Sequence, residues 1–124
     1  MYYGLPISLD FDGTLCTHEY PNIGRSIGAE KVLRRLVEEG VPLILNTMRG
    51  GKYLEDAVNW FKERDIPLAA VNANIFPLTW TDSPKIYAKF YIDDSALGCP
   101  LKQGLTGEMP YVDWEKVEQI LFPE

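Results

Sequence analysis

Two aspartates one residue apart stand out in this sequence as groups that could do chemistry. In the segment LDFDGTL, Asp10 and Asp12 end a short apolar run and are followed at once by Gly13 and Thr14. Two carboxylates at this spacing can divide the work of a group transfer, because one can attack as a nucleophile while the other carries protons. Taken alone, the pattern is also typical of a solvated turn, since Asp and Gly favour turns.

Three further positions carry residue types that phosphate and metal chemistry uses. Thr47 stands in LILNTMR, Lys85 precedes KFYIDD, and that segment ends in the pair Asp93 and Asp94. Several carboxylates gathered in one place cannot all stay ionised without a cation. Carboxylate and carbonyl oxygens without a cluster of His or Cys suit magnesium, which keeps positions open for water and phosphate. The sequence therefore predicts a magnesium site if these segments meet.

The hydrophobic pattern predicts the elements that would bring these residues together. Apolar runs predict strands near 6–11, 41–45, 68–71 and 89–92, and helical periodicity predicts helices over 29–39 and 53–65. Asp113 is expected to cap a last helix with Trp114, Val117, Ile120 and Leu121 on its buried face. This order is typical of βα units around a mostly parallel sheet, where ligands bind beyond the carboxyl ends of the strands. The segment 72–84 has no period and is expected to be a loop.

Length and composition limit the classes of protein that this chain can belong to. The 124 residues predict one domain, 1–124, and 46% hydrophobic with 24% charged residues is ordinary for a globular protein. The net charge of -6 argues against nucleic acid or an anionic membrane as a partner. No stretch approaches the roughly 18 apolar residues of a spanning helix. We therefore expect a cytoplasmic protein, with Cys16 and Cys99 as reduced thiols.

The order of the polar motifs resembles the haloacid dehalogenase (HAD) superfamily. Its first motif appears as DFDGT from Asp10, its second as Thr47, its third as Lys85 and its fourth as Asp93-Asp94 in YIDD. The resemblance covers most of the chain and implies an α/β fold, a three-layer sandwich with a mostly parallel, Rossmannoid central sheet. The segments HEYPNIG, DAVNWF and PKIYAKFYIDD are also similar to small bacterial and phage members. The connections leave little room for the cap domain that HAD enzymes often carry, so the resemblance points to a capless member.

The resemblance implies a magnesium-dependent phosphatase that works through an aspartyl phosphate. Asp10 would be the nucleophile and Asp12 the general acid and base. Mg²⁺ would be held by the Asp10 carboxylate, the Asp12 backbone carbonyl and one carboxylate of the pair Asp93 and Asp94. We favour Asp94 as the direct ligand.

The remaining motif residues are expected around the phosphoryl group. Thr47 would offer its hydroxyl to a phosphoryl oxygen, although a threonine at this place is also typical of a helix N-cap. Lys85 would offset the negative charge of nucleophile and phosphate, with Lys89 as the competing lysine. Substrate binding is expected from Gly13, Thr14 and Arg49. His18, the only histidine, we interpret as a surface residue.

Other interpretations of the acidic motif differ in how well they fit. An EF-hand fails, because its glycine and bidentate glutamate would fall on Leu15 and Pro21. A two-component receiver domain has a similar length but a different motif order, with its acceptor aspartate in mid-chain. A HAD fold that binds phosphoryl groups or a partner without turnover is the third alternative. The phosphorylated substrate, whether a small molecule, a glycan or a macromolecule, stays open, as do the phosphoryl acceptor and the oligomeric state.

Overall fold

A parallel β-sheet forms the centre of the computed structural model, which describes residues 4–123. Its four strands are β1 (Ile7–Leu9), β2 (Leu43–Leu45), β3 (Ala70–Val71) and β4 (Phe90–Ile92), in the order β3-β2-β1-β4. Ile7 of β1 pairs with Leu43 on one side and with Phe90 on the other. Strand β1 therefore lies between β2 and β4, and the segments that follow these three strands leave the same edge of the sheet.

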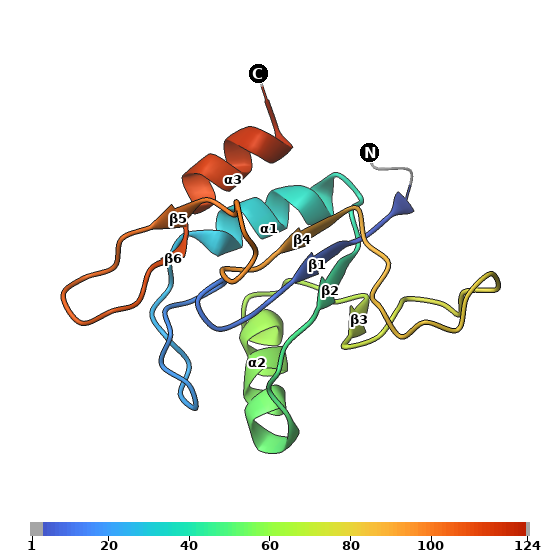
Figure 1. Ribbon diagram of the computed structural model, residues 1–124, viewed down its shortest axis with the longest axis horizontal. Coiled ribbons are helices and arrows are strands. Elements are labelled where there is room, and N and C mark those ends of the chain that lie inside the picture. The colour runs from blue at the N-terminus through green and yellow to red at the C-terminus, as the bar shows by residue number, and fades with distance from the viewer. Residues whose placement is uncertain (1–3, 124) are drawn as a thin grey trace.

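Helices cover the sheet on both sides. Helices α1 (Ala29–Glu38) and α3 (Trp114–Leu121) lie on one side and contact each other, and α2 (Gly51–Glu63) lies on the other side (Figure 1). Every residue of β1 and β2 is buried, which explains why β2 is a continuous apolar run and why Ser8, the middle residue of β1, is a small one. In the core below the sheet, Phe11 packs edge-on against Trp60 of α2, with ring centroids 5.9 Å apart.

A short antiparallel hairpin joins the sheet region to the last helix. Its strands are β5 (Leu101–Lys102) and β6 (Tyr111–Val112). The sequence did not predict them, because strands of two residues are too short to show an alternation of side chains. Asp113 follows β6 and caps α3 as predicted, its side chain accepting a hydrogen bond from the backbone N–H of Lys116 at 3.2 Å.

Most predicted elements are confirmed, with shifted bounds. The predicted helix 53–65 begins earlier, at Gly51, and ends at Glu63. The prediction that Ile120 lies on the buried face of α3 is wrong, because its side chain is 60% exposed while Leu121 is buried. The segment 72–84 holds no helix or strand, as expected, and exposes Phe76 and Trp80, and β4 begins at Phe90 rather than at Lys89. Within residues 4–123, no helix is long and apolar enough to cross a membrane, and both cysteines are free.

Candidate metal centre and active site

Three carboxylates meet where β1 and β4 end. The backbone N–H of Asp10 donates to the carbonyl of Ile92 at 3.0 Å, which continues the parallel ladder one residue past the strands. Asp10 therefore lies beside Asp93 and Asp94, and one carboxylate oxygen from each of the three lies within 4.8 Å of the others. All three are half-buried. Such a set of oxygen ligands suits a hard divalent cation, which would relieve the repulsion among the carboxylates.

The hydroxyl of Thr14 links two of these carboxylates. It donates to Oδ2 of Asp10 at 2.9 Å and lies 3.3 Å from Oδ1 of Asp94. The same oxygen accepts the backbone N–H of Asp94 at 3.0 Å. Thr14 is fully buried. Its hydroxyl therefore fixes the positions of two acids, and the structure gives no support to its predicted contact with substrate.

The cluster changes the acidity of Asp10. Burial, the neighbouring Asp94 carboxyl and the charge of Asp93 together raise the pKa of Asp10 from its ordinary value of 3.8 to about 7, although the Thr14 hydrogen bond lowers it. Burial and nearby carboxylates both disfavour the ionised form of an acid. A cation bound among the three acids would reverse this effect, because it favours the ionised form.

Gly13 allows the chain to turn tightly beside the cluster. Its φ of +78° lies in the left-handed region, which glycine adopts without steric cost. A side chain at this position would collide with Nε2 of His18 and with Oδ2 of Asp94. The missing side chain therefore leaves the room in which these two groups meet, and the contribution of Gly13 in this structure is to the shape of the turn.

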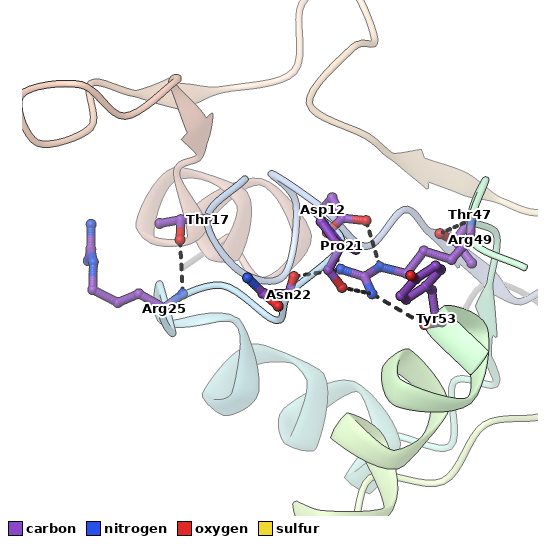
Figure 2. A network of polar contacts seen from close by, with 8 residues as sticks. All are labelled: Asp12, Thr17, Pro21, Asn22, Arg25, Thr47, Arg49 and Tyr53. Carbon is purple, nitrogen blue, oxygen red and sulfur yellow. Dashed lines mark hydrogen bonds and ion pairs between the residues drawn. The ribbon is translucent and has the colours of Figure 1, made fainter. Parts of the chain in front are cut away.

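Asp12 binds an arginine instead of joining the three acids. Its carboxylate is not part of the cluster that Asp10, Asp93 and Asp94 form among the described residues. Instead it accepts two hydrogen bonds from Arg49, from Nε to Oδ2 at 2.8 Å and from a terminal nitrogen to Oδ1 at 2.7 Å (Figure 2). This fork is the strong, bidentate form of an arginine–carboxylate pair.

The rest of the Arg49 guanidinium is also occupied by the protein. Its remaining N–H groups donate to the carbonyl oxygens of Pro21 (3.1 Å), Asn22 (2.8 Å) and Tyr53 (3.3 Å). These bonds use all five donors that an arginine side chain has. Burial of Arg49 is nearly complete, at 3% exposed. No donor is left for a substrate anion in this arrangement, so the structure gives no support to the predicted substrate-binding role of Arg49.

Thr47 follows β2 at the same edge of the sheet. Its backbone N–H donates to the side-chain oxygen of Asn72 at 2.8 Å. Its hydroxyl oxygen accepts the backbone N–H of Arg49 at 3.1 Å (Figure 2). The N-cap of α2 is Gly50, so the N-cap interpretation of Thr47 is wrong. This bond uses a lone pair and not the hydroxyl proton, so the hydroxyl can donate to a phosphoryl oxygen as well.

Neither candidate lysine contacts the acidic cluster. Lys85 is exposed, and its Nζ lies 5.4 Å from the ring centroid of Tyr91. Lys89 is also exposed, with Nζ 5.9 Å from the ring centroid of Phe90. Among residues 4–123, no ion pair within 4.0 Å involves either lysine. The assignment of the third motif to Lys85 therefore stays a prediction.

Two hydrogen bonds from the chain after β4 hold the turn of the first motif. The backbone N–H of Val112 in β6 donates to the carbonyl of Gly13 at 3.0 Å. The indole Nε1 of Trp114 donates to the carbonyl of Thr14 at 2.7 Å, and this bond is buried. The sequence predicted that Trp114 lies in the core on the last helix, but it did not predict this hydrogen bond. Hydrophobic periodicity indicates which face of a helix is buried and not which group an indole N–H contacts.

His18 is the site residue that sequence reasoning missed. It is half-buried rather than on the surface, and its Nε2 lies 2.6 Å from Oδ2 of Asp94. The contact depends on the path of the segment after Gly13 and not on any strand or helix. Its position four residues after Thr14 in DGTLCTH could not have identified it.

Fold and site together define an α/β protein with a parallel sheet and a cluster of carboxylates at the carboxyl edge of that sheet. No protein-family model matches the chain, and no curated protein matches it. Among solved structures, it is similar to a conserved protein from Bacteroides thetaiotaomicron. The two are 31% identical with a TM-score of 0.76, and the match covers 95% of this chain and 89% of the other. The chain belongs to the same family as this Bacteroides protein.

Proposed function

We propose that this protein is a magnesium-dependent phosphatase of the HAD type that works through an aspartyl phosphate. The fold would be a three-layer α/β sandwich of Rossmannoid type without a cap domain. One observation carries the proposal: the carboxylates of Asp10, Asp93 and Asp94 lie within 4.8 Å of one another at the ends of two neighbouring parallel strands. Ligands of open α/β sheets bind at this edge.

Asp10 would attack the phosphorus atom of a phosphate monoester. A bond forms between its carboxylate oxygen and phosphorus as the bond to the leaving alkoxide breaks, and Asp12 gives that alkoxide a proton. A water molecule then attacks the phosphorus of the aspartyl phosphate. Its proton passes to Asp12, phosphate leaves, and the carboxylate of Asp10 is restored.

Mg²⁺ would be held by the carboxylates of Asp10 and Asp94 and by the backbone carbonyl of Asp12, with Asp93 as the alternative to Asp94. When bound, it would neutralise charge on the phosphoryl oxygens. Both acids have hydrogen-bond partners, Ser95 for Asp93 and Thr14 with His18 for Asp94, so the preference for Asp94 rests on the resemblance.

Two other residues would bind the phosphoryl group. The hydroxyl proton of Thr47 is available, as its oxygen accepts the N–H of Arg49. Lys85 would supply positive charge, because its flexible stem could bring Nζ toward the site when a phosphate is bound. Without a cap, the open edge of the sheet would admit the phosphoryl group of a large substrate as well as a small one.

The test is phosphate release from a broad panel of phosphoesters, with and without Mg²⁺. The wild-type protein is expected to release phosphate from at least one ester only when Mg²⁺ is present. Asp10→Asn is expected to abolish release, because an amide is not a nucleophile. Asp12→Asn should slow it by about 10²–10⁴-fold, the usual contribution of a general acid and base. Asp82→Asn, at an exposed position in the loop before β4, is the matched control.

Either of two results would count against hydrolysis. Equal release by wild type and Asp10→Asn would exclude Asp10 as nucleophile. If the wild type releases nothing but forms a long-lived adduct with acetyl phosphate at Asp10, a phosphoryl-accepting or phosphate-binding domain is the better interpretation. The raised pKa of Asp10 does not distinguish hydrolysis from phosphoryl acceptance, because both need the same ionised carboxylate.

A further inference from the structure

Arg49 connects the proposed proton carrier to two other parts of the chain. Its fork binds Asp12, and its other donors bind the segment containing Pro21 and Asn22 and the first turn of α2 at Tyr53 (Figure 2). We propose that Arg49 is a positioning residue for Asp12, which holds the carboxylate in one orientation before substrate binds. This inference rests on the proposed function, in which Asp12 carries the protons.

The surroundings of Arg49 leave the guanidinium little freedom. Three backbone carbonyls from two segments fix its plane, and the side chain itself is 1% exposed. Its central carbon also lies 5.0 Å from the ring centroid of Phe11 and 5.1 Å from that of Tyr20. Because a guanidinium is planar and rigid, a fork that is held in this way also fixes the carboxylate that it binds.

The fork leaves part of the Asp12 carboxylate open to a leaving oxygen or a water molecule. Each carboxylate oxygen accepts one hydrogen bond from Arg49, and an ionised carboxylate has about four lone-pair sites. One site on each oxygen therefore stays open. The Asp12 side chain is 18% exposed, so part of it faces away from the arginine. A carboxylate that is already oriented loses less freedom when it meets the leaving oxygen, which lowers the barrier to transfer.

The test exploits the fact that leaving groups differ in their need for a proton. An alkyl phosphate releases an alkoxide, which needs a proton from Asp12, whereas p-nitrophenyl phosphate releases a stable phenolate. Arg49→Lys keeps the positive charge but removes the fork. Values of kcat and KM would be measured on both esters at saturating Mg²⁺. We expect kcat on the alkyl ester to fall by about ten-fold more than kcat on the p-nitrophenyl ester, with KM nearly unchanged.

A double variant distinguishes a positioning role of Arg49 from a general effect of its substitution on the fold. In an Asp12→Asn background, Arg49→Lys should have little further effect on kcat, because the group that it orients is gone. Thermal unfolding would show that each variant is folded. If Arg49→Lys does not fold, Arg49→Gln would replace it, since its amide can still donate to a carboxylate oxygen.

Arg64→Lys is the matched control. Arg64 also pairs with a carboxylate (Glu30, 3.3 Å), donates to a backbone carbonyl (Trp60, 3.1 Å) and lies over an aromatic ring, but it follows the far end of α2. The Arg64→Lys substitution should change kcat by the same factor on the two esters.

The possible results distinguish this inference from the proposed function. If wild type shows no Mg²⁺-dependent release from these two esters or from any other ester of the panel, the proposed function fails and the inference fails with it. If wild type is active but Arg49→Lys loses the same factor on both esters, Arg49 does not act through Asp12. A rise in KM at constant kcat would show that Arg49 binds substrate instead. Each of these last two results overturns the inference and leaves the phosphatase standing.

Discussion

Nε2 of His18 lies 2.6 Å from Oδ2 of Asp94, although the two residues are 76 positions apart in the chain. A histidine that contacts a carboxylate in this way limits the rotation of that carboxylate. If Asp94 binds the cation, His18 orients a ligand without binding the metal itself. Partners of metal ligands commonly contribute about 10- to 100-fold to metal affinity.

His18→Ala is therefore expected to raise the Mg²⁺ concentration that gives half-maximal activity by about ten-fold, with kcat at saturating Mg²⁺ much less affected. The measurement is a Mg²⁺ titration of phosphate release. His18→Gln should lie between wild type and alanine, because its amide can still donate. Glu19→Gln, at an exposed neighbour, is the control. An unchanged Mg²⁺ requirement in His18→Ala would show that His18 does not orient a ligand.

Gly13→Ala should lower both the stability of the protein and its activity. The added side chain would collide with His18 and Asp94, and a residue other than glycine at φ +78° costs about 1–2 kcal/mol by itself. We expect a loss of more than about 2 kcal/mol in urea unfolding, together with a loss of activity because Asp94 must move. Gly107→Ala isolates the collision, since Gly107 has a φ of +87° and nothing within 4 Å of an added side chain. Equal losses in the two variants would contradict the argument.

The meeting of Asp10 with Asp93 and Asp94 could be predicted from the sequence in outline. Apolar stretches mark β1 and β4 as strands, and parallel strands bring their carboxyl ends to one edge of a sheet. The position of each acid relative to the end of its strand is local information, so it survives errors of one or two residues in the strand bounds. That β1 and β4 are neighbours is not local information, and the sequence left it as a condition.

Contacts made by loops could not be predicted in this way. Arg49 reaches Asp12 across 37 positions, and the contact depends on the paths of two irregular segments. The sequence also does not distinguish a buried arginine from a surface arginine, because burial depends on partners that lie elsewhere in the chain. The error at Ile120 has another origin. Helical spacing allowed both Ile120 and Leu121, and a helix of eight residues buries only a narrow stripe.

Thr14→Val tests whether one hydroxyl holds two of the acids together. Valine has nearly the same shape, but it leaves the backbone N–H of Asp94 without its acceptor and Asp10 without its donor. We expect a loss of about 1–3 kcal/mol in the free energy of unfolding, the cost of unpaired buried polar groups. Thr14→Ser keeps the hydroxyl and should lose less, mainly through the missing methyl group. If serine and valine variants unfold at the same urea concentration, the hydroxyl does not hold the cluster.

Asp10→Asn should make the metal-free protein more stable at neutral pH. The pKa of Asp10 is about 7 in the folded protein and 3.8 ordinarily, so the folded state keeps a proton that the unfolded chain loses earlier. Ionisation of Asp10 therefore disfavours folding increasingly as pH rises from about 4 to about 7, and by a constant amount above that. Asparagine carries no charge and avoids this cost.

Urea unfolding in EDTA across this pH range would measure the effect. The advantage of Asp10→Asn over wild type should be near zero at about pH 4 and reach about 1–2 kcal/mol above pH 7, a figure that allows for screening at a half-buried site. Added Mg²⁺ should stabilise wild type at pH 7.5 and should stabilise Asp10→Asn much less, because the variant has lost a ligand. Asp82→Asn, exposed and distant in the chain, should follow wild type throughout. An advantage for Asp10→Asn that does not change with pH would mean that burial and the neighbouring acids do not raise the pKa of Asp10 in the folded protein.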